Sequence, residues 1–497
     1  MGDTVKHSLV TTTTGRIEGF VEGSLSKFFG IPYAAPPVGP LRWHAPMPQN
    51  GWEVVRPAKN FGSACVQTVG ASFGLRAAQK SEDCLYLNVW TRTTDTSAGQ
   101  PVMVWIHGGG NLGGGGCEDA YDGSSLAAKG VTVVTFNYRL GAFGFLVHPD
   151  VGGNFGVLDQ VAALAWVRDN IAAFGGAAGN VTVFGESAGA VAVRTLLSCP
   201  TARNLFHRAA MQSAGFESPA FAPPWSYGRA QAAAEKLFEA LGSKDLNVLR
   251  NVPTAEVGRL SHELCGVIPV PGKVTTPANL VWMPVLDEQV VYASGYPGWP
   301  DKVPLMMGCT ENEARYFIKP GGVYPPQAVV GMASVLCGPK RDDVLAILER
   351  DGGTPYESLD KLFTTAIWIE PAAETARKFA ELGRSVYCYH FHRRAPGAIA
   401  SQDLAKHTSE IRYVFGNLTS NGYYDAVDET LSLEMQDAWI SFAREGIPRR
   451  KDGSAWPVYR DDDRLLSLID TAIRTRSYEL SELARAINSI RVSTAGC

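Results

Sequence analysis

The stretch that decides the fold is VTVFGESAGAVAVRTLLS, residues 181–198. A short strand-like run comes first, then a G-x-S-x-G motif centred on Ser187, then a run of small residues typical of a helix. A serine on such a sharp strand-to-helix turn is held in a strained backbone conformation with its hydroxyl exposed. Gly185 and Gly189 keep neighbouring chains clear of side chains. The stretch therefore predicts a nucleophile, Ser187, at the start of a helix whose dipole favours developing negative charge.

The segments around this unit continue the alternation of strand and helix. Apolar runs that resemble buried strands occur at 85–90, 102–107, 131–138, 303–310 and 385–392, and 158–176 has the pattern of an amphipathic helix. Continuous apolar runs are typical of strands covered on both faces. The order predicts an α/β fold with a mostly parallel central sheet flanked by helices. We expect one catalytic domain over 1–497, with insertions roughly at 216–300 and 315–400 shaping the substrate pocket.

The composition is that of an ordinary globular protein. Of 497 residues, 45% are hydrophobic and 19% charged, and the formal net charge is -4. Without an excess of positive charge we expect no nucleic-acid or membrane partner, and no run of 18 apolar residues predicts a transmembrane helix. The N-terminus, MGDTVKHSLVTTTTG, lacks the regions of a signal peptide; its Met-Gly start slightly favours a mature secreted or periplasmic chain over a cytoplasmic one. The oligomeric state is left open between monomer and dimer.

The cysteines do not form a disulfide scaffold. There are nine in the chain, and the odd number leaves at least one thiol free. Cys65 and Cys84 lie close together in a polar loop, where a small disulfide-closed loop is expected. The other seven are expected to be small hydrophobic residues of the core.

A serine nucleophile needs a base, and three histidines follow it at suitable positions. In this architecture the chain order is serine, acid, histidine. His390 and His392 alternate on a predicted strand, which favours an ordinary structural role. His407 lies in the polar stretch DLAKHTSEIRYVFGN, where a loop histidine can reach a serine at the rim of the sheet. We therefore choose His407 as the base.

The acid should follow a strand between the serine and the histidine. Glu311 and Glu313 come directly after the apolar run 303–310, and Asp287 follows WMPVL. The local pattern leaves the two glutamates nearly equal.

A glycine-rich loop, HGGG at 107–110, follows the strand-like run 102–107. Backbone amides of such a loop, together with the amide of Ala188, form the oxyanion hole in this architecture. Each donor is worth about 3–4 kcal/mol in the transition state. That exceeds the conformational cost of a glycine, roughly 0.5–1 kcal/mol. The second run, Gly113–Gly116, is not explained by this chemistry.

Together these residues resemble the type-B carboxylesterase and cholinesterase family of α/β-hydrolases. The motifs that carry the resemblance span nearly the whole chain: FFGIPYAAPPVGPLRW (28–43), SEDCLYLNVW (81–90), VMVWIHGGG (102–110), FNYRLGAFGFL (136–146), VTVFGESAGA (181–190) and IRYVFGNL (411–418). Within this family the motifs most resemble those of bacterial para-nitrobenzyl esterases, and next those of fumonisin esterases. The loop between Cys65 and Cys84 contains no tryptophan, which argues against choline recognition.

The resemblance implies an α/β-hydrolase fold and ester hydrolysis through an acyl-enzyme, without metal or organic cofactor. The family spacing from Gly308 selects Glu313 as the acid beside Ser187 and His407. The resemblance also implies Gly109, Gly110 and Ala188 as oxyanion donors, a Cys65–Cys84 disulfide, Ser213 as a support of the acid and histidine, and buried ion pairs Arg42–Glu82 and Arg139–Asp159.

The substrate pocket is expected to include Asn111, Glu186, Trp282, Arg315, Phe317, Trp368 and Arg412. Because relatives usually place an aromatic residue at Asn111, we expect Asn111 and Gly113–Gly116 to give a wide, polar and mobile acyl side. The first hypothesis is a carboxylesterase of small to bulky esters. The alternatives are a fumonisin-type esterase that releases tricarballylate, with Arg315 and Arg412 meeting carboxylates, and a non-catalytic binding or adhesion module.

Overall fold

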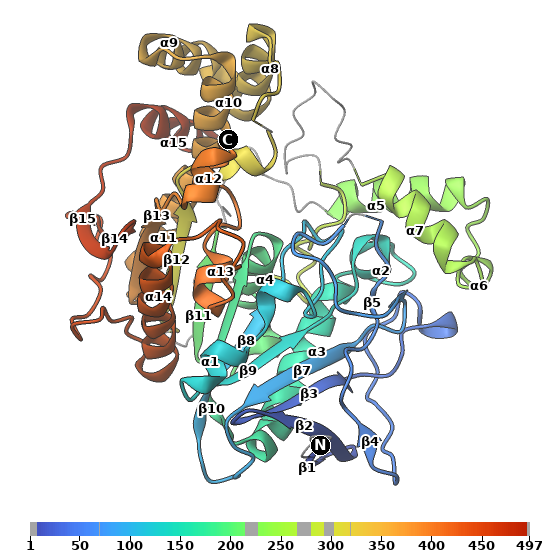
Figure 1. Cartoon of the computed structure of the whole chain (residues 1–497). Helices are drawn as coiled ribbons and strands as arrows, with labels where there is room; N and C mark the ends of the chain where they lie inside the picture. The colour runs from blue at the N-terminus through green and yellow to red at the C-terminus, as the bar shows by residue number, and fades with distance from the viewer. Residues whose placement is uncertain are drawn as a thin grey trace.

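The protein is built around a large twisted sheet, seen in the computed structural model of Figure 1. The structure describes residues 7–68, 70–213, 227–265, 280–292, 303–318 and 320–494. The expected insertion at 216–300 is therefore described only at 227–265 and 280–292. Within these ranges no helix is both long enough and apolar enough to cross a membrane.

The sheet has parallel strands at its centre and antiparallel strands at both edges. From edge to edge the order is β1 (His7–Thr12), β2 (Gly15–Glu22), β3 (Leu25–Pro32), β7 (Tyr86–Thr91), β9 (Thr132–Phe136), β8 (Gln100–Ile106), β10 (Gly176–Glu186), β11 (Arg208–Gln212), β12 (Leu305–Thr310), β13 (Val386–Phe391), β14 (Leu465–Ile469) and β15 (Ile473–Ser477). The short β4 (Arg56–Pro57) pairs with β2, and β5 (Ala64–Cys65) pairs with β6 (Lys80–Ser81) apart from the main sheet.

The central strands are buried on both faces, which explains their continuous apolar sequences. In β8, Val102, Val104 and Ile106 belong to the core on one face of the sheet. Met103 and Trp105 belong to the core on the other face. The first core includes side chains of α3 (Phe155–Asn170) and the second includes side chains of α14 (Ala426–Glu445). The strand sequence therefore does not alternate between apolar and polar residues, because neither face of the sheet is exposed to water.

The remaining helices gather around the sheet and at one end of it (Figure 1). They are α1 (Ser124–Ala128), α2 (Gly141–Phe145), α4 (Ala188–Leu196), α5 (Tyr227–Ala240), α6 (Leu246–Leu249), α7 (Thr254–Glu263), α8 (Pro326–Cys337), α9 (Arg341–Asp351), α10 (Pro355–Thr364), α11 (Glu370–Glu381), α12 (Pro396–Ala400), α13 (Ile411–Phe415) and α15 (Glu482–Thr494). A π-helical turn, Thr365–Ile369, joins α10 to α11. In Figure 1, α8, α9 and α10 lie at the end of the molecule opposite β1–β4.

Both buried ion pairs expected from the resemblance are formed. Arg42 Nη2 lies 2.6 Å from Glu82 Oε1, and Arg139 Nη2 lies 2.7 Å from Asp159 Oδ1. Each arginine makes two contacts to its carboxylate, the geometry in which a guanidinium binds a carboxylate most strongly.

The expected Cys65–Cys84 disulfide is not formed in the structure. Both residues are buried free thiols. A hydrogen bond with Cys65, together with burial, raises the pKa of Cys84 well above its usual value. The fold therefore places the two buried thiols near each other, as the resemblance implies, but the structure contains them as free cysteines.

Candidate active site

Ser187 lies at the sharp turn between β10 and α4. Its backbone has φ 55° and ψ −123°, outside the helical and strand regions. The turn packs directly against β8, since a Cβ on Gly189 would stand 1.9 Å from the carbonyl oxygen of Ile106. A Cβ on Gly185 would stand 2.7 Å from the same oxygen. Both motif glycines are thus required by close packing, and the turn presents the Ser187 side chain with partial exposure.

His407 and Glu313 meet in the buried interior beside this turn. Nδ1 of His407 lies 2.6 Å from Oε2 of Glu313. The other carboxylate oxygen of Glu313 accepts a hydrogen bond from the amide of Thr310, the last residue of β12, at 2.7 Å. Glu313 is fully buried and His407 is 2% exposed. Two hydrogen bonds therefore fix the carboxylate, which in turn fixes the orientation of the imidazole.

The other acids and histidines considered from the sequence are engaged elsewhere. Glu311 forms an ion pair with Arg394 at 2.8 Å. His390 and His392 lie on β13 or at its end and contact each other at 2.8 Å. Asp287 accepts three backbone amides of a turn, Gln289 to Val291. The geometry therefore separates Glu313 from Glu311, which the local sequence left equal.

The imidazole of His407 lies between two carboxylates. Nε2 is 3.1 Å from Oε1 of Glu186, but without hydrogen-bond geometry, and within the described residues Nε2 has no hydrogen-bond partner. Burial opposes protonation of His407, but the charges of Glu186 and Glu313 outweigh it and raise its pKa to about 9. Burial likewise raises the pKa of Glu186 well above its usual value, against the attraction of His407. Glu186 therefore stabilises a cationic imidazole only while Glu186 itself is ionised, whereas Glu313 does so through its direct contact with Nδ1.

The glycine-rich loop places backbone amides beside the Ser187 turn. A Cβ on Gly108 would stand 3.2 Å from Cβ of Ser187. Gly109 and Gly110 have φ values of 101° and 63°, and in the described part of the chain their amides donate to no protein acceptor. Ala188 is the first residue of α4, where amides lack intrahelical acceptors. Three amide donors are therefore available near the serine.

The second glycine run does not widen the pocket, contrary to the expectation from the sequence. All residues from Leu112 to Glu118 are buried. A Cβ on Gly114 would stand 2.6 Å from Nδ1 of His107, and one on Gly116 would stand 2.7 Å from the amide of Phe136. These glycines let the loop pack against β9 and His107, so they are required by packing and not by a large substrate.

Phe317 and Trp368 form an aromatic wall around the imidazole. Each ring centroid lies 5.4 Å from that of His407, and the two rings stack on each other. Tyr316, which the sequence did not single out, lies at 5.7 Å, and its hydroxyl contacts Ser72 Oγ at 2.9 Å. Trp282 belongs to the main core instead and is 1% exposed. A signal for Tyr316 was present in the aromatic run beside Glu313.

The polar residues expected in the pocket have protein partners. Asn111 is 1% exposed, and its amide group contacts the backbone oxygen of Trp282 and the sulfur of Met283. Arg315 binds Asp360 at 2.6 Å, which leaves its guanidinium engaged. Arg412 donates to the carbonyl oxygen of Asn417 and lies over the ring of Phe73. The guanidinium of Arg315 and the amide nitrogen of Asn111 are therefore already engaged by the protein.

Ser213 contacts a buried acid that the sequence analysis missed. Its hydroxyl lies 3.3 Å from Oε1 of Glu410, and the hydroxyl of Tyr389 lies 3.4 Å from the same oxygen. Burial and the charge of Glu313 raise the pKa of Glu410 to about 7. Glu410 stands three residues after His407, and that spacing was the available signal.

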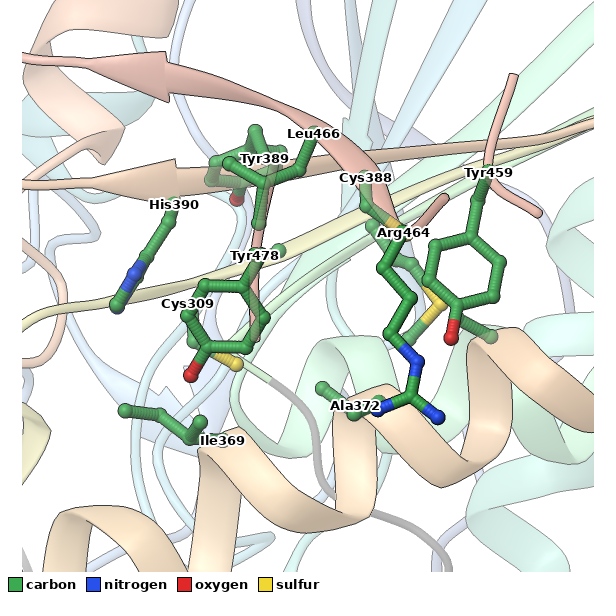
Figure 2. Close-up of a pocket in the computed structure, with 14 residues that line it drawn as sticks. Cys309, Ile369, Ala372, Cys388, Tyr389, His390, Tyr459, Arg464, Leu466 and Tyr478 are labelled. Carbon is green, nitrogen blue, oxygen red and sulfur yellow. The ribbon is translucent and has the colours of Figure 1, made fainter. Parts of the chain in front are cut away.

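A cavity lies behind the strand that ends near Glu313, between β12–β14 and α11 (Figure 2). It encloses about 470 Å³, its opening included, and its walls are mainly apolar. Ile369 lines this cavity, whereas the adjacent Trp368 packs against His407. The π-helical turn therefore separates the cavity from the imidazole. Within the described ranges, no group of three His, Cys, Asp or Glu side chains is arranged to hold a metal ion.

Comparison with known proteins agrees with this geometry. The model of the carboxylesterase family matches residues 6–323 and 342–485. Fumonisin B1 esterase of Sphingopyxis macrogoltabida is 36% identical over 90% of this chain and 84% of its own length. Para-nitrobenzyl esterase of Bacillus subtilis (strain 168) is 35% identical over 96% of this chain and 97% of its own.

The same relationship appears in three dimensions. A solved PNB esterase, 34% identical in sequence, superposes with a TM-score of 0.84 and covers 97% of this chain and 100% of its own. The family comprises carboxylic ester hydrolases, and its fold is the α/β-hydrolase fold expected from the sequence. The protein is therefore a member of the carboxylesterase family and a serine carboxylic ester hydrolase that acts on small-molecule esters.

Proposed function

We propose that Ser187, His407 and Glu313 form the catalytic triad of this esterase, with Gly109, Gly110 and Ala188 as its oxyanion donors. The observation that carries the proposal is the 2.6 Å contact between His407 Nδ1 and Glu313 Oε2, next to a serine held at a strained strand-to-helix turn. A nucleophile, a base and an orienting acid in this arrangement are the requirements of acyl transfer.

In the proposed reaction, Nε2 of His407 takes the proton of the Ser187 hydroxyl while Oγ attacks the ester carbonyl carbon. The negative charge on the carbonyl oxygen is stabilised by the three amides. His407 then gives its proton to the departing alcohol, which leaves an acyl-serine. Water activated by the same imidazole attacks the acyl carbon and releases the acid. Glu313 stays ionised and holds the imidazole in the correct tautomer.

The assignment is tested with Ser187→Ala and Glu313→Gln, and Glu311→Gln serves as the matched control. Loss of Ser187 should lower kcat by at least about 10⁴-fold with a para-nitrophenyl ester, and Glu313→Gln should lower it by about 10⁴-fold. Glu311→Gln should leave kcat within about twofold, because Glu311 pairs with Arg394 instead of His407. Hydrolysis retained in Ser187→Ala, or equal losses in the two glutamate variants, would refute the assignment.

The substrate range proposed first is that of a carboxylesterase for small to bulky esters, including aromatic ones. Its support is the aromatic wall of Phe317 and Trp368 and the 35% identity to a para-nitrobenzyl esterase over nearly the full length of both chains. We propose that the enzyme works on these esters as a monomer or dimer without a nucleic-acid or membrane partner. A mature secreted or periplasmic location remains a prediction.

A second candidate is an esterase of the fumonisin type, supported by the 36% identity to a fumonisin B1 esterase. The role predicted for Arg315 loses support, because its guanidinium is bound by Asp360. Release of tricarballylate from fumonisin B1, measured beside hydrolysis of a para-nitrobenzyl ester, separates the two candidates. No release at micromolar enzyme, with the aromatic ester cleaved, would eliminate the second. The non-catalytic alternative is dropped, because the family is one of hydrolases.

A further inference from the structure

A second cavity, here called the Arg412 cavity, lies between the loop 65–84, the segment around His407 and the connection from α13 to α14. It encloses about 800 Å³, its opening included. Lys406 and Thr408, the two neighbours of His407 in the chain, line it, but His407 and Ser187 do not. The cavity is therefore outside the hydrolytic site while sharing a segment with it.

Arg412 contributes to this cavity a cation that no carboxylate of the described residues contacts directly. Of the other cations in its wall, Arg393 pairs with Asp425 and Asp428, and Lys406 pairs with Asp403. Arg412 is partly buried, donates to the carbonyl oxygen of Asn417 at 2.9 Å, and has no carboxylate within ion-pair distance among the described residues. A partly desolvated guanidinium without a counter-charge favours an anionic ligand.

Thr408 supplies a second, independent observation. It is a β-branched residue with φ 76°, a left-handed conformation that such side chains rarely adopt. Its side chain is 8% exposed and lines the cavity, and within the described residues its hydroxyl has no hydrogen-bond partner. Strained conformations of this kind persist where the surrounding structure enforces them, often at ligand sites. Thr408 and Arg412 therefore give the same cavity two polar groups that a ligand can bind: a hydroxyl without a protein partner among the described residues and a guanidinium without a carboxylate partner.

Part of the rest of the wall is aromatic and apolar, and it stands beside the polar side chains of Asp403, Ser409, Thr419 and Asn421. Phe73, Tyr423 and Tyr424 contribute rings, and Ala395, Ala398 and Leu404 contribute aliphatic surface. The guanidinium of Arg412 lies 5.1 Å from the centre of the Phe73 ring, so charge and ring are adjacent. An inorganic anion would satisfy the cation but would leave these rings in contact with water. A flat ring that carries a carboxylate can contact both the Arg412 guanidinium and the aromatic rings of the wall.

We propose that the Arg412 cavity binds an aromatic carboxylate, with the carboxylate on Arg412 and the Thr408 hydroxyl and the ring against Phe73 and Tyr424. Binding does not depend on which ester the enzyme cleaves, since no residue of the triad lines the cavity. Lys406 and Thr408 are the chain neighbours of His407, so a ligand bound in the cavity contacts the segment that carries this base.

The test is calorimetric titration of benzoate into the full-length protein after reaction of Ser187 with phenylmethylsulfonyl fluoride. Mass spectrometry confirms the modification, so benzoate bound in the hydrolytic site as a product is not counted. We expect one benzoate per chain, binding at least tenfold weaker in Arg412→Gln and several-fold weaker in Thr408→Val. Benzamide, the uncharged analogue, should bind at least tenfold more weakly than benzoate.

Arg168→Gln is the matched control, because Arg168 is an exposed arginine on α3 that does not line the cavity. It should bind benzoate as the parent protein does. Circular dichroism checks that each variant is folded. If Arg412→Gln does not fold, the benzoate affinity of Thr408→Val still decides the outcome. Equal benzoate affinity in the parent protein and the folded cavity variants, equal affinity for benzamide, or tighter binding of inorganic phosphate would overturn the proposal. If the serine is not modified, the triad assignment is in question, and the same titrations on unmodified protein decide the cavity separately.

Discussion

At the scale of single residues, the feature that sets the pH dependence of this site is a histidine held between two acids. Glu313 orients the imidazole through Nδ1, while Glu186 stands 3.1 Å from Nε2, the nitrogen that must accept the serine proton. An imidazole with a pKa of about 9 is mostly protonated at neutral pH, so only a small share of His407 is then neutral and able to act as the base. Activity should therefore increase with pH toward that value.

The variant Glu186→Gln tests this directly. Glu186 is the largest charge effect that raises the pKa of His407, so removing this carboxylate near Nε2 removes an attraction for the imidazolium and lowers that pKa. A larger share of His407 is then neutral at pH 7, so the acidic limb of the profile of kcat/KM against pH moves to lower pH. Rates measured from pH 5 to 10 with a neutral ester show the shift.

The control for this variant is Glu311→Gln, which removes a nearby carboxylate that is not among the causes of the His407 shift. Its profile should overlay that of the parent enzyme. An acidic limb that stays in place in Glu186→Gln would contradict the electrostatic account of His407.

Residue identities in the site were predictable where a motif demands a backbone geometry. Ser187 follows from G-x-S-x-G, because only this spacing of glycines permits the turn against β8. The choice of Glu313 over Glu311 needed the family resemblance, since both follow the same strand. Arg315 could not be judged from sequence, because its partner Asp360 lies 45 residues away on α10. The local sequence around a side chain does not indicate which distant residue it will contact in the folded protein.

At the scale of elements, the loop 107–118 shows two uses of glycine. Gly109 and Gly110 take left-handed φ values that aim their amides, whereas Gly116 is pressed against the backbone of Phe136. The second use concerns stability alone. Sequence cannot distinguish the two, because both appear as consecutive glycines.

We expect Gly116→Ala to destabilise the protein by at least about 1–3 kcal/mol, because its Cβ would stand 2.7 Å from backbone that cannot move aside. Chemical denaturation measures the loss, and the folded fraction should keep the parent's preference among esters. Gly179→Ala is the control, since nothing lies within 4 Å of a Cβ there. A stable Gly116→Ala with a narrowed substrate range would instead restore the idea that this glycine makes room for substrate.

Helix α11 leaves the apolar cavity of Figure 2 partly empty, and a larger side chain should fill it. Ala372 lies on the wall of that cavity, so Ala372→Leu adds apolar contacts without lowering helix propensity much. We expect a gain of about 0.5–2 kcal/mol in the free energy of unfolding. Urea denaturation of Ala372→Leu is compared with Ala380→Leu, on the same helix but away from the cavity. A loss of stability would mean that the space is too narrow for a leucine.

The elements that were predictable are those with strong periodicity. The strands β7 to β9, β12 and β13 match the apolar runs of the sequence to within about two residues, and helix α3 overlaps the pattern at 158–176 but ends at Asn170. Strand β11 was missed, because RAAMQ is short and its small residues carry little strand propensity. The π-helical turn at Thr365–Ile369 gives no local signal either, and its Trp368 belongs to the buried cluster that includes residues of α8, α9 and α10.

At the scale of the whole molecule, the sheet assembles the site from distant parts of the chain. Ser187 follows β10, Glu313 follows β12, and His407 comes after β13, so three parallel strands deliver the three groups to one edge. The amides of Gly109 and Gly110 arrive after β8, next to β10 in the sheet. Because parallel strands end at the same side, their order in the sheet decides which loops meet.

The buried ion pair of Arg42 and Glu82 connects the first third of the chain to the segment that contains α6 and α7. Arg42 also donates to the carbonyl oxygens of Leu249 and Val252 in and after α6, and Thr254 at the start of α7 contacts Glu82. Three segments distant in sequence therefore meet at one ion pair. Because the pair is bidentate and buried, removing one charged partner should destabilise the protein strongly, whereas replacing both residues by hydrophobic ones should cost little stability.

We expect Arg42→Met to lower the free energy of unfolding by about 3–5 kcal/mol, because it leaves Glu82 buried without its counter-charge. Glu82→Leu alone should cost a similar amount, since the guanidinium is then unpaired. The double variant Arg42→Met/Glu82→Leu removes both charges and should recover much of the loss, so that the double-mutant cycle gives a coupling energy of at least about 1–3 kcal/mol. Denaturation midpoints of the four proteins at pH 7 measure the cycle, with Arg168→Met reporting the loss of an exposed arginine. If the two losses in the free energy of unfolding simply add in the double variant, the ion pair with Glu82 contributes little. The hydrogen bonds from Arg42 to the carbonyl oxygens of Leu249 and Val252 then hold the segments together.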